Sequence, residues 1–198
     1  MDLLLGNVPW MAWNLVLALV PAALSVPLFV LGRRPTPFWW LGLVTFVAFL
    51  PNAPYVLSDV IHFIDQVRRT HDNLLVAFGL IPQYLLFFLT GFGCYALSII
   101  RLQRWLRARG WSWTRLLAVE VVLHALCAVG IFLGRVFRFN SWDLITTPGA
   151  IADVVRIPQP TSVLLLVLTF LVLAGGTGVL HLVTRSPLGR AVQRSMFG

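Results

Sequence analysis

The sequence predicts an all-α fold: an integral membrane bundle of about five transmembrane helices, the second of them broken by prolines. Hydrophobic residues make up 59% of the 198-residue chain and charged residues only 11%, whereas soluble domains average about 25% charged residues. The apolar residues gather in five long stretches, and a helix that crosses a bilayer needs about 20 such residues. The chain shows no alternation of apolar and polar residues of the kind found in membrane barrels, so we expect helices as the spanning elements.

The five stretches follow one another closely, and we expect a single transmembrane domain over residues 1–198. The opening sequence has no basic segment before its apolar run, so it is predicted to be a retained first helix and not a cleaved signal peptide. Pro21 and Pro27 predict kinks in this helix. The expected spans cover residues 8–31, 38–57, 73–100, 116–133 and 161–183.

Two segments outside the spans are expected to lie along the membrane surface. Residues 140–160 mix short apolar runs with Pro148, Gly149 and Pro158, which is typical of an interfacial segment, and a sixth crossing there stays open. The cytoplasmic tail, residues 184–198, is predicted either to form a short amphipathic helix on the inner leaflet or to fray.

The basic residues predict the orientation of the chain in the membrane. All fifteen are arginines, and cytoplasmic loops carry an excess of basic residues. Ten fall in the first connection, the third connection and the C-terminal tail, which share one side of a five-span protein, and five fall on the other side. We therefore expect a multi-pass protein of the bacterial inner (plasma) membrane, with its N-terminus outside and its C-terminus in the cytoplasm. Because the arginines flank apolar spans, the sequence pI of about 11.2 indicates contact with membrane lipid and not with nucleic acid.

The second span is interrupted by the sequence PNAPYVLSD, which begins at Pro51. Pro51 and Pro54 remove backbone donors and disfavour helix just before each of them. We expect a helix that ends near Leu50, a short non-helical link, and a second half-helix from Ala53 onward, with Asn52 as its N-cap. Backbone freed at this depth must be buried in protein or face water, and a helix N-terminus there suits an anion or a carbonyl oxygen.

The second half-helix carries a polar stripe, because Tyr55, Asp59, His62 and Gln66 follow one another at i, i+4, i+7 and i+11. Such a row can relay protons, contribute to a metal site or hold a polar headgroup, and His is the side chain most easily tuned near neutral pH. A stripe that simply faces water outside the membrane is the alternative. Ionisable groups inside a membrane usually serve function, so we favour Asp59 and His62 as candidate catalytic acid–base groups, with Asn52 and Tyr55 orienting a substrate.

A second polar constellation, GRVFRFNSWD, follows the fourth span on the same expected side as the break. Arg135 and Arg138 share a helical face at i, i+3, and guanidinium groups bind phosphate or carboxylate through two parallel hydrogen bonds. The alternatives are arginines that reach lipid phosphates from the interface and arginines that pair with Asp59, Asp65 or Asp143. The density of polar groups favours a substrate-binding turn made of Arg135, Arg138, Asn140, Ser141, Trp142 and Asp143.

The remaining ionisable residues in the spans are weaker candidates. Glu120 and His124 lie at i, i+4 in the fourth span, and an intramembrane Glu is a candidate for function. A structural Glu–His pair, or a Glu held by Arg101 or Arg115, is an equally good interpretation. His181 lies near the inner end of the last span and is interpreted as interfacial.

Three further predictions concern cofactors and buried side chains. The chain has no P-loop, GxSxG, HExxH or CxxC motif, and Asp59 with His62 is a weak metal signal without further ligands. We therefore predict no metal site and leave any cofactor unassigned. Cys94 and Cys127 are expected to be buried thiols without a disulfide, and Gln83 is expected to satisfy a kink at the neighbouring proline.

The two motifs resemble the signature stretches of a bacterial and cyanobacterial family of multi-pass membrane proteins, catalogued as domain-of-unknown-function family 1361. Similar sequences read Leu-Pro-Asn-x-Pro-Tyr followed by an Asp and a His, and later Gly-Arg, Arg and Asn-Ser-Trp-Asp. The resemblance covers about residues 20–185, implies a membrane protein and brings no activity with it. The matching positions in this chain are Leu50, Pro51, Asn52, Pro54, Tyr55, Asp59, His62, Gly134, Arg135, Arg138, Asn140, Ser141, Trp142 and Asp143.

Three functions fit these observations. The first is an enzyme that acts on a lipid or lipid-linked anionic substrate, with the arginines as a headgroup clamp. The second is a small transporter or lipid-binding subunit, since a broken helix resembles the half-helix sites of transporters. The third is a structural or assembly subunit that meets a membrane partner protein or a second copy of the chain. We favour the enzyme.

Overall fold

The computed structural model describes residues 2–31, 35–136, 146 and 160–185. These residues are helical almost throughout and form no strand, which confirms the predicted all-α fold. The predicted interfacial segment and tail fall outside the described residues except for positions 146, 160, 184 and 185. Within these described residues, five helical segments are long and apolar enough to cross a membrane: Asp2–Val30, Pro37–Arg69, Asn73–Arg107, Trp113–Val136 and Val163–Leu182.

The first three spans contain irregular turns, and the last two are single helices. The first span is α1 (Asp2–Ser25) followed by a π-helical turn, η1 (Val26–Val30). The second consists of α2 (Pro37–Phe49), α3 (Asn52–Tyr55), the 3-10 turn η2 (Val56–Asp59) and α4 (Val60–Arg69). The third consists of α5 (Asn73–Leu75), the π-helical turn η3 (Val76–Leu80) and α6 (Ile81–Arg107). The last two are α7 (Trp113–Val136) and α10 (Pro160–Arg185).

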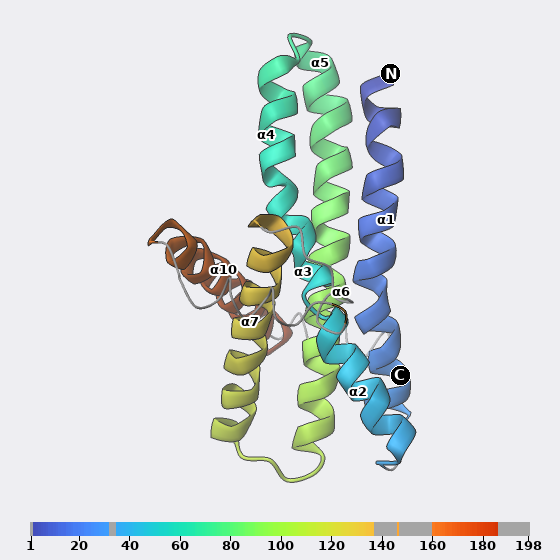
Figure 1. Ribbon diagram of the computed structural model, residues 1–198, viewed down its shortest axis with the longest axis vertical. Coiled ribbons are helices and arrows are strands. Elements are labelled where there is room, and N and C mark those ends of the chain that lie inside the picture. Colours follow the sequence, from blue (N-terminus) through green and yellow to red (C-terminus); the bar gives the residue numbers. More distant parts are fainter. Residues whose placement is uncertain (1, 32–34, 137–145, 147–159, 186–198) are drawn as a thin grey trace.

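α1, α4, α6 and α7 run back and forth along the long axis of the bundle (Figure 1). α1 packs against α6 and against α3, while α7 packs against α3 on the other side. α10 packs on α7 and lies at a steep angle to it. Of the two prolines expected to kink the first helix, Pro21 lies within α1 and Pro27 lies in the π-helical turn that follows.

The second span is interrupted at Leu50 and Pro51 as predicted, but the link that was expected to be non-helical keeps helical dihedral angles, and Pro54 lies inside the next helix. α2 ends at Phe49, a turn at Leu50 and Pro51 follows, and α3 begins at Asn52. The Tyr55 amide donates to the Pro51 carbonyl at 3.1 Å, so a helical hydrogen bond follows the turn directly. Proline fits because its ring holds φ near −65°, and Pro51 has a φ of −60° and a ψ of −25°. The span therefore bends without unwinding, and α2 is tilted relative to α4 (Figure 1).

Asn52 is not the N-cap that the sequence predicts. A side-chain cap requires an extended residue before the helix, and Pro51, which occupies that position, has helical dihedral angles. Instead, Asn52 Nδ2 donates to the Phe49 carbonyl at 3.1 Å. The Ala53 amide, which would reach Phe49 in a regular α-helix, donates to the Leu50 carbonyl at 3.2 Å. The Asn52 side chain thus satisfies a carbonyl that the bend deprives of its regular partner.

The bend is buried against two glycines of neighbouring helices. A Cβ at Gly91 of α6 would lie 2.1 Å from Val56 Cγ2 and 2.9 Å from the Ala53 carbonyl oxygen. A Cβ at Gly130 of α7 would lie 2.7 Å from Pro51 Cβ. Only glycine allows such close approach, so the irregular backbone is covered by protein, which is one of the two environments expected at this depth.

Aromatic residues mark the end of the bundle at which α2 begins and α6 ends. The rings of Trp39 and Trp105 stack with centroids 5.2 Å apart, and the Arg109 guanidinium lies 3.4 Å from the Trp105 ring centroid. α2 therefore begins at the end of the bundle at which α6 ends (Figure 1). Which side of the membrane this end faces stays a prediction.

Candidate functional site

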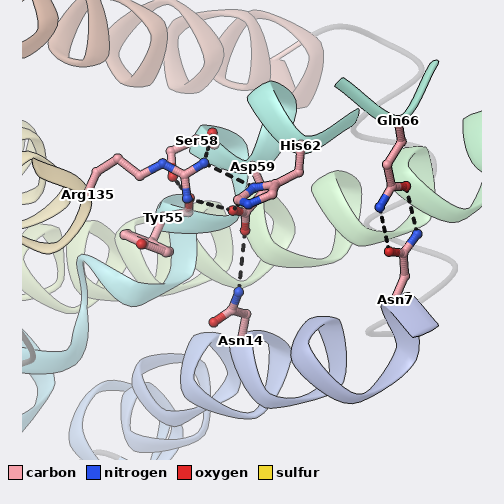
Figure 2. A network of polar contacts seen from close by, with 8 residues as sticks. All are labelled: Asn7, Asn14, Tyr55, Ser58, Asp59, His62, Gln66 and Arg135. Atoms are coloured by element: carbon pink, nitrogen blue, oxygen red, sulfur yellow. Dashed lines mark hydrogen bonds and ion pairs between the residues drawn. The ribbon is translucent and has the colours of Figure 1, made fainter. Parts of the chain in front are cut away.

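The centre of the candidate site is the carboxylate of Asp59, which is 2% exposed. Arg135, on the last turn of α7, donates Nη1 to Asp59 Oδ1 at 2.9 Å. Asn14 of α1 places its Nδ2 3.4 Å from Asp59 Oδ2. One carboxylate thus links the first, second and fourth spans (Figure 2). Of the alternatives for Arg135, the structure shows the ion pair with Asp59.

The 3-10 turn η2 directs Asp59 into the bundle. Residues at i and i+3 eclipse each other in a 3-10 helix, and Val56 and Asp59, which are three apart, are both buried. Tyr55 would share the face of Asp59 in a regular α-helix, but its ring is only half-buried and lies on the Arg135 side of the cluster (Figure 2). The predicted stripe therefore holds for Asp59, His62 and Gln66 and not for Tyr55.

His62 is the most exposed member of the cluster, with 56% of its side chain accessible. Its Nδ1 lies 3.3 Å from Asp59 Oδ1 and 3.2 Å from Arg135 Nη2, and its ring packs on Trp10 at 5.7 Å. A single ring nitrogen either donates or accepts. Nδ1 therefore donates to Asp59 when it carries a proton and accepts from Arg135 when it does not. The protonation of His62 is thereby linked to the hydrogen bonding of both charged neighbours.

Arg135 is partly exposed, at 24% of its side chain, and is held by acceptors on one edge. Besides Asp59, its Nη2 donates to the Ser58 carbonyl at 3.1 Å. A guanidinium has five N–H donors, and within the described part of the chain its contacts to Asp59, Ser58 and His62 use three of them. The geometry leaves Arg135 able to contact an anion while it is fixed by Asp59.

A ladder of amide side chains joins α1 to α4 beyond Asp59. Asn7 and Gln66 exchange two hydrogen bonds, with Asn7 Nδ2 donating at 3.0 Å and Gln66 Nε2 donating at 2.8 Å. Asn7 and Asn14 are seven residues apart, and so are Asp59 and Gln66, so two antiparallel helices meet at two matching levels (Figure 2). Sequence reasoning missed both asparagines, although two polar residues seven apart in an apolar helix are a detectable signal.

Gln83 joins this ladder and does not satisfy the proline kink that the sequence suggested. It accepts from Asn7 Nδ2 at 3.0 Å, and its own Nε2 donates to the Leu4 carbonyl at 2.9 Å. The third span is thereby tied to the first through a side-chain amide.

The remaining residues of the second motif lie outside the described part of the chain. These are Arg138, Asn140, Ser141, Trp142 and Asp143, and their predicted role in substrate binding stays a prediction. Within the described residues, no group of three or more His, Cys, Asp or Glu is arranged to hold a metal ion. Cys94 and Cys127 are both buried free thiols, as expected.

Comparison with known protein families identifies a matching family model. A family model described as "Protein of unknown function (DUF1361)" matches residues 13–174, a range that contains both sequence motifs. No curated protein and no solved structure matches the chain.

Proposed function

This chain belongs to the DUF1361 family, and we propose that it binds the anionic headgroup of a lipid or lipid-linked substrate at the cluster of Asp59, His62 and Arg135 and acts on it as an enzyme. The five apolar helices support a membrane substrate. The proposed setting is the outer side of a bacterial inner membrane, because the arginine distribution places the break there. No partner other than the lipid is required by this proposal.

One observation carries the proposal: a buried carboxylate holds an arginine and a histidine that both reach the surface. Asp59 is 3% exposed at its side chain, Arg135 is 24% exposed and His62 is 56% exposed. A guanidinium fixed in this way is suited to a phosphate or carboxylate, and it costs little further entropy to bind one.

The same contacts divide the roles of the two candidate acid–base groups. Asp59 already accepts from Arg135 and Asn14, so it is suited to positioning its neighbours. His62 has a ring nitrogen next to Asp59 and a largely exposed side chain, which is the arrangement of a general acid–base group oriented by a carboxylate. We therefore assign proton transfer to His62 and headgroup binding to Arg135.

Native mass spectrometry of the gently purified protein tests the binding step. We expect an anionic lipid to co-purify with the wild type and to be lost from Arg135→Gln, since glutamine cannot clamp an anion. Arg69→Gln is the matched control, because Arg69 is an exposed arginine on α4 that pairs with Asp65 at 2.9 Å. Equal lipid occupancy in the wild type and Arg135→Gln would contradict the proposal.

Lipid analysis of membranes that express the protein tests the reaction. His62→Ala should keep the bound lipid but accumulate a species that the wild type converts, because the clamp is intact and the acid–base group is missing. Identical bound lipids in the wild type and His62→Ala would contradict the catalytic part of the proposal and leave the binding part unchanged.

The second candidate is a structural or assembly role, which the link between three spans favours. Asp59 joins α1 and α7 to η2, and such a tie stabilises the bundle whether or not a ligand binds. If Arg135→Gln loses thermal stability and no lipid is found on the wild type, this role takes the place of the enzyme.

A further inference from the structure

A second polar cluster lies between α6, α7 and α10 and shares no residue with the cluster around Asp59. Its centre is Glu120 of α7, whose side chain is 8% exposed. Gln103 of α6 donates Nε2 to Glu120 Oε2. The Nε2 atoms of His124 and His181 lie 3.5 Å and 3.4 Å from Glu120 Oε1. The carboxylate is therefore surrounded by an amide and two imidazoles inside a membrane-spanning segment.

Within the described part of the chain, no arginine lies beside Glu120. Among the described residues, its hydrogen-bond and ion-pair partners are Gln103, His124, His181 and Thr177. Arg101, one of the two arginines suggested for this role, donates instead to the Ala22 carbonyl at 3.0 Å and the Ser25 hydroxyl at 2.9 Å. The other, at position 115, is exposed.

An isolated carboxylate inside a bundle is costly unless a positive group or a proton neutralises it. With imidazoles as the ionisable neighbours, Glu120 is either protonated itself or ionised next to a protonated histidine. In both cases the cluster holds one proton more than an ionised carboxylate with neutral imidazoles would hold. The question is then which histidine shares it.

His124 fits its surroundings as a neutral imidazole. The Thr177 hydroxyl donates to the Leu173 carbonyl at 3.0 Å, so its oxygen is available to accept from His124 Nε2 at 3.1 Å. Nδ1 then accepts from the Tyr95 hydroxyl, and every polar atom of the ring has a partner. A second proton on this ring would make Nδ1 a donor and displace the donation from Tyr95, which leaves His181 as the partner that shares the proton.

We propose that Glu120 and His181 form a proton-binding site within the membrane-spanning bundle, with one proton shared between the carboxylate and the imidazole. His181 is the most exposed of the three side chains, at 22% compared with 8% for Glu120 and 3% for His124, although its Nε2 atom, which faces Glu120, is buried. We therefore expect the proton to enter and leave through the exposed part of the His181 ring. His124 positions the carboxylate from the buried side, and Gln103 does so from α6.

The neighbouring groups leave this assignment unchanged. Among the described side chains, the other titratable groups around the pair are Tyr95 from α6 and His124 from α7, and Cys127 of α7 contacts Tyr95. From α10, the neutral hydroxyl of Thr177 lies beside His124 and Glu120. The described residues in this region do not include a group arranged to hold a metal ion. The site therefore gives the chain a group that takes up and releases a proton independently of the lipid site.

Nitrogen-15 NMR of the imidazole rings, on the full-length protein in lipid nanodiscs, tests the shared proton. In the wild type we expect the His181 resonances to change with pH, and in Glu120→Gln we expect that transition to shift to lower pH or to disappear. Glutamine keeps the size and hydrogen-bonding capacity of the side chain while it removes the charge. His71, an exposed residue between α4 and α5, is the internal control and should titrate identically in both proteins.

Infrared pH-difference spectroscopy measures the protonation of the Glu120 carboxyl group directly. His181→Asn should leave a protonated carboxylic acid band over a wider pH range than in the wild type, and the band should be absent from Glu120→Gln. Glu120→Asp keeps the charge and should retain part of the coupling between the carboxyl group and His181. This variant separates the loss of the charge from a folding defect in the glutamine variant. Identical His181 titrations in the wild type and Glu120→Gln, or a carboxyl band unaffected by His181→Asn, would overturn the proposal.

Discussion

The carboxylate of Asp59 lies 2.9 Å from the guanidinium of Arg135, which is 76 residues further along the chain. Asn14 adds a third span to the same carboxylate. The groups proposed to bind a headgroup are therefore also the groups that hold three spans together. Experiments on this cluster have to separate an effect on stability from an effect on function. Variants of the exposed His62 do so better than variants of the buried Asp59.

Removal of either partner of the Asp59–Arg135 pair should destabilise the bundle. Breaking a buried ion pair costs about 3–5 kcal/mol because the other charge is left without a partner, and the partial exposure of Arg135 places the expected loss near the lower end. The double variant Asp59→Asn/Arg135→Gln should lose less than the sum of the single variants, with a coupling of about 1–3 kcal/mol. Thermal unfolding in nanodiscs measures this cycle, and additive losses would show that the pair is not coupled.

A methyl group at Gly91 should destabilise the fold, whereas one at Gly93 should not. The Gly91 Cβ would lie 2.1 Å from Val56 Cγ2, while nothing lies within 4 Å of a Cβ at Gly93. Overpacking costs about 1–3 kcal/mol, and Gly→Ala at an open helix position gains about 0.5–1 kcal/mol. Both residues lie on α6, so the pair of alanine variants is a matched comparison. Equal unfolding temperatures for the two would contradict the close packing at the bend.

Asn7→Leu should weaken the contact between the first span and the second and third spans more than Asn14→Leu does. Asn7 takes part in three side-chain hydrogen bonds, to Gln66 and Gln83, whereas Asn14 makes one long contact of 3.4 Å to Asp59. Interhelical hydrogen bonds in membranes average about 0.6 kcal/mol each, so we expect a loss of about 1–2 kcal/mol for Asn7→Leu. Unfolding in increasing denaturing detergent gives the comparison, and a larger loss for Asn14→Leu would refute this ranking.

The predicted orientation is testable by labelling introduced cysteines from outside the cell. His71→Cys, in the exposed connection after α4, should react with a membrane-impermeant maleimide in intact cells, because the arginine count places it outside. Ser112→Cys, in the exposed connection before α7, should react only after permeabilisation. The native thiols, Cys94 and Cys127, are buried and provide a low background. The reverse pattern would invert the predicted topology.

The fold class and the identity of the central residues were predictable because both depend on local properties. Apolar stretches of spanning length predict membrane helices, and charged residues within them are costly enough to mark themselves as candidates. Asp59 and His62 were predicted on that ground, and Arg135 was predicted from the density of polar groups in its motif. The structure brings these three residues together. Asn7 and Asn14 were not predicted because an uncharged amide costs less to bury in an apolar helix than a charged group does.

The sequence by itself determined that the chain is a helical membrane bundle, that its second span is interrupted near Pro51, and that Asp59, His62 and Glu120 are candidate ionisable groups for function. Only the tertiary structure decided how these features are used. It showed that the break is a helical bend packed on Gly91 and Gly130, that Asp59 pairs with Arg135 and that Glu120 meets His181 and not Arg101. The physical reason for this division is that the cost of burying a charged group depends on its residue type, which the sequence gives. The partner that offsets this cost comes from a distant helix, and the packing of the helices sets its position.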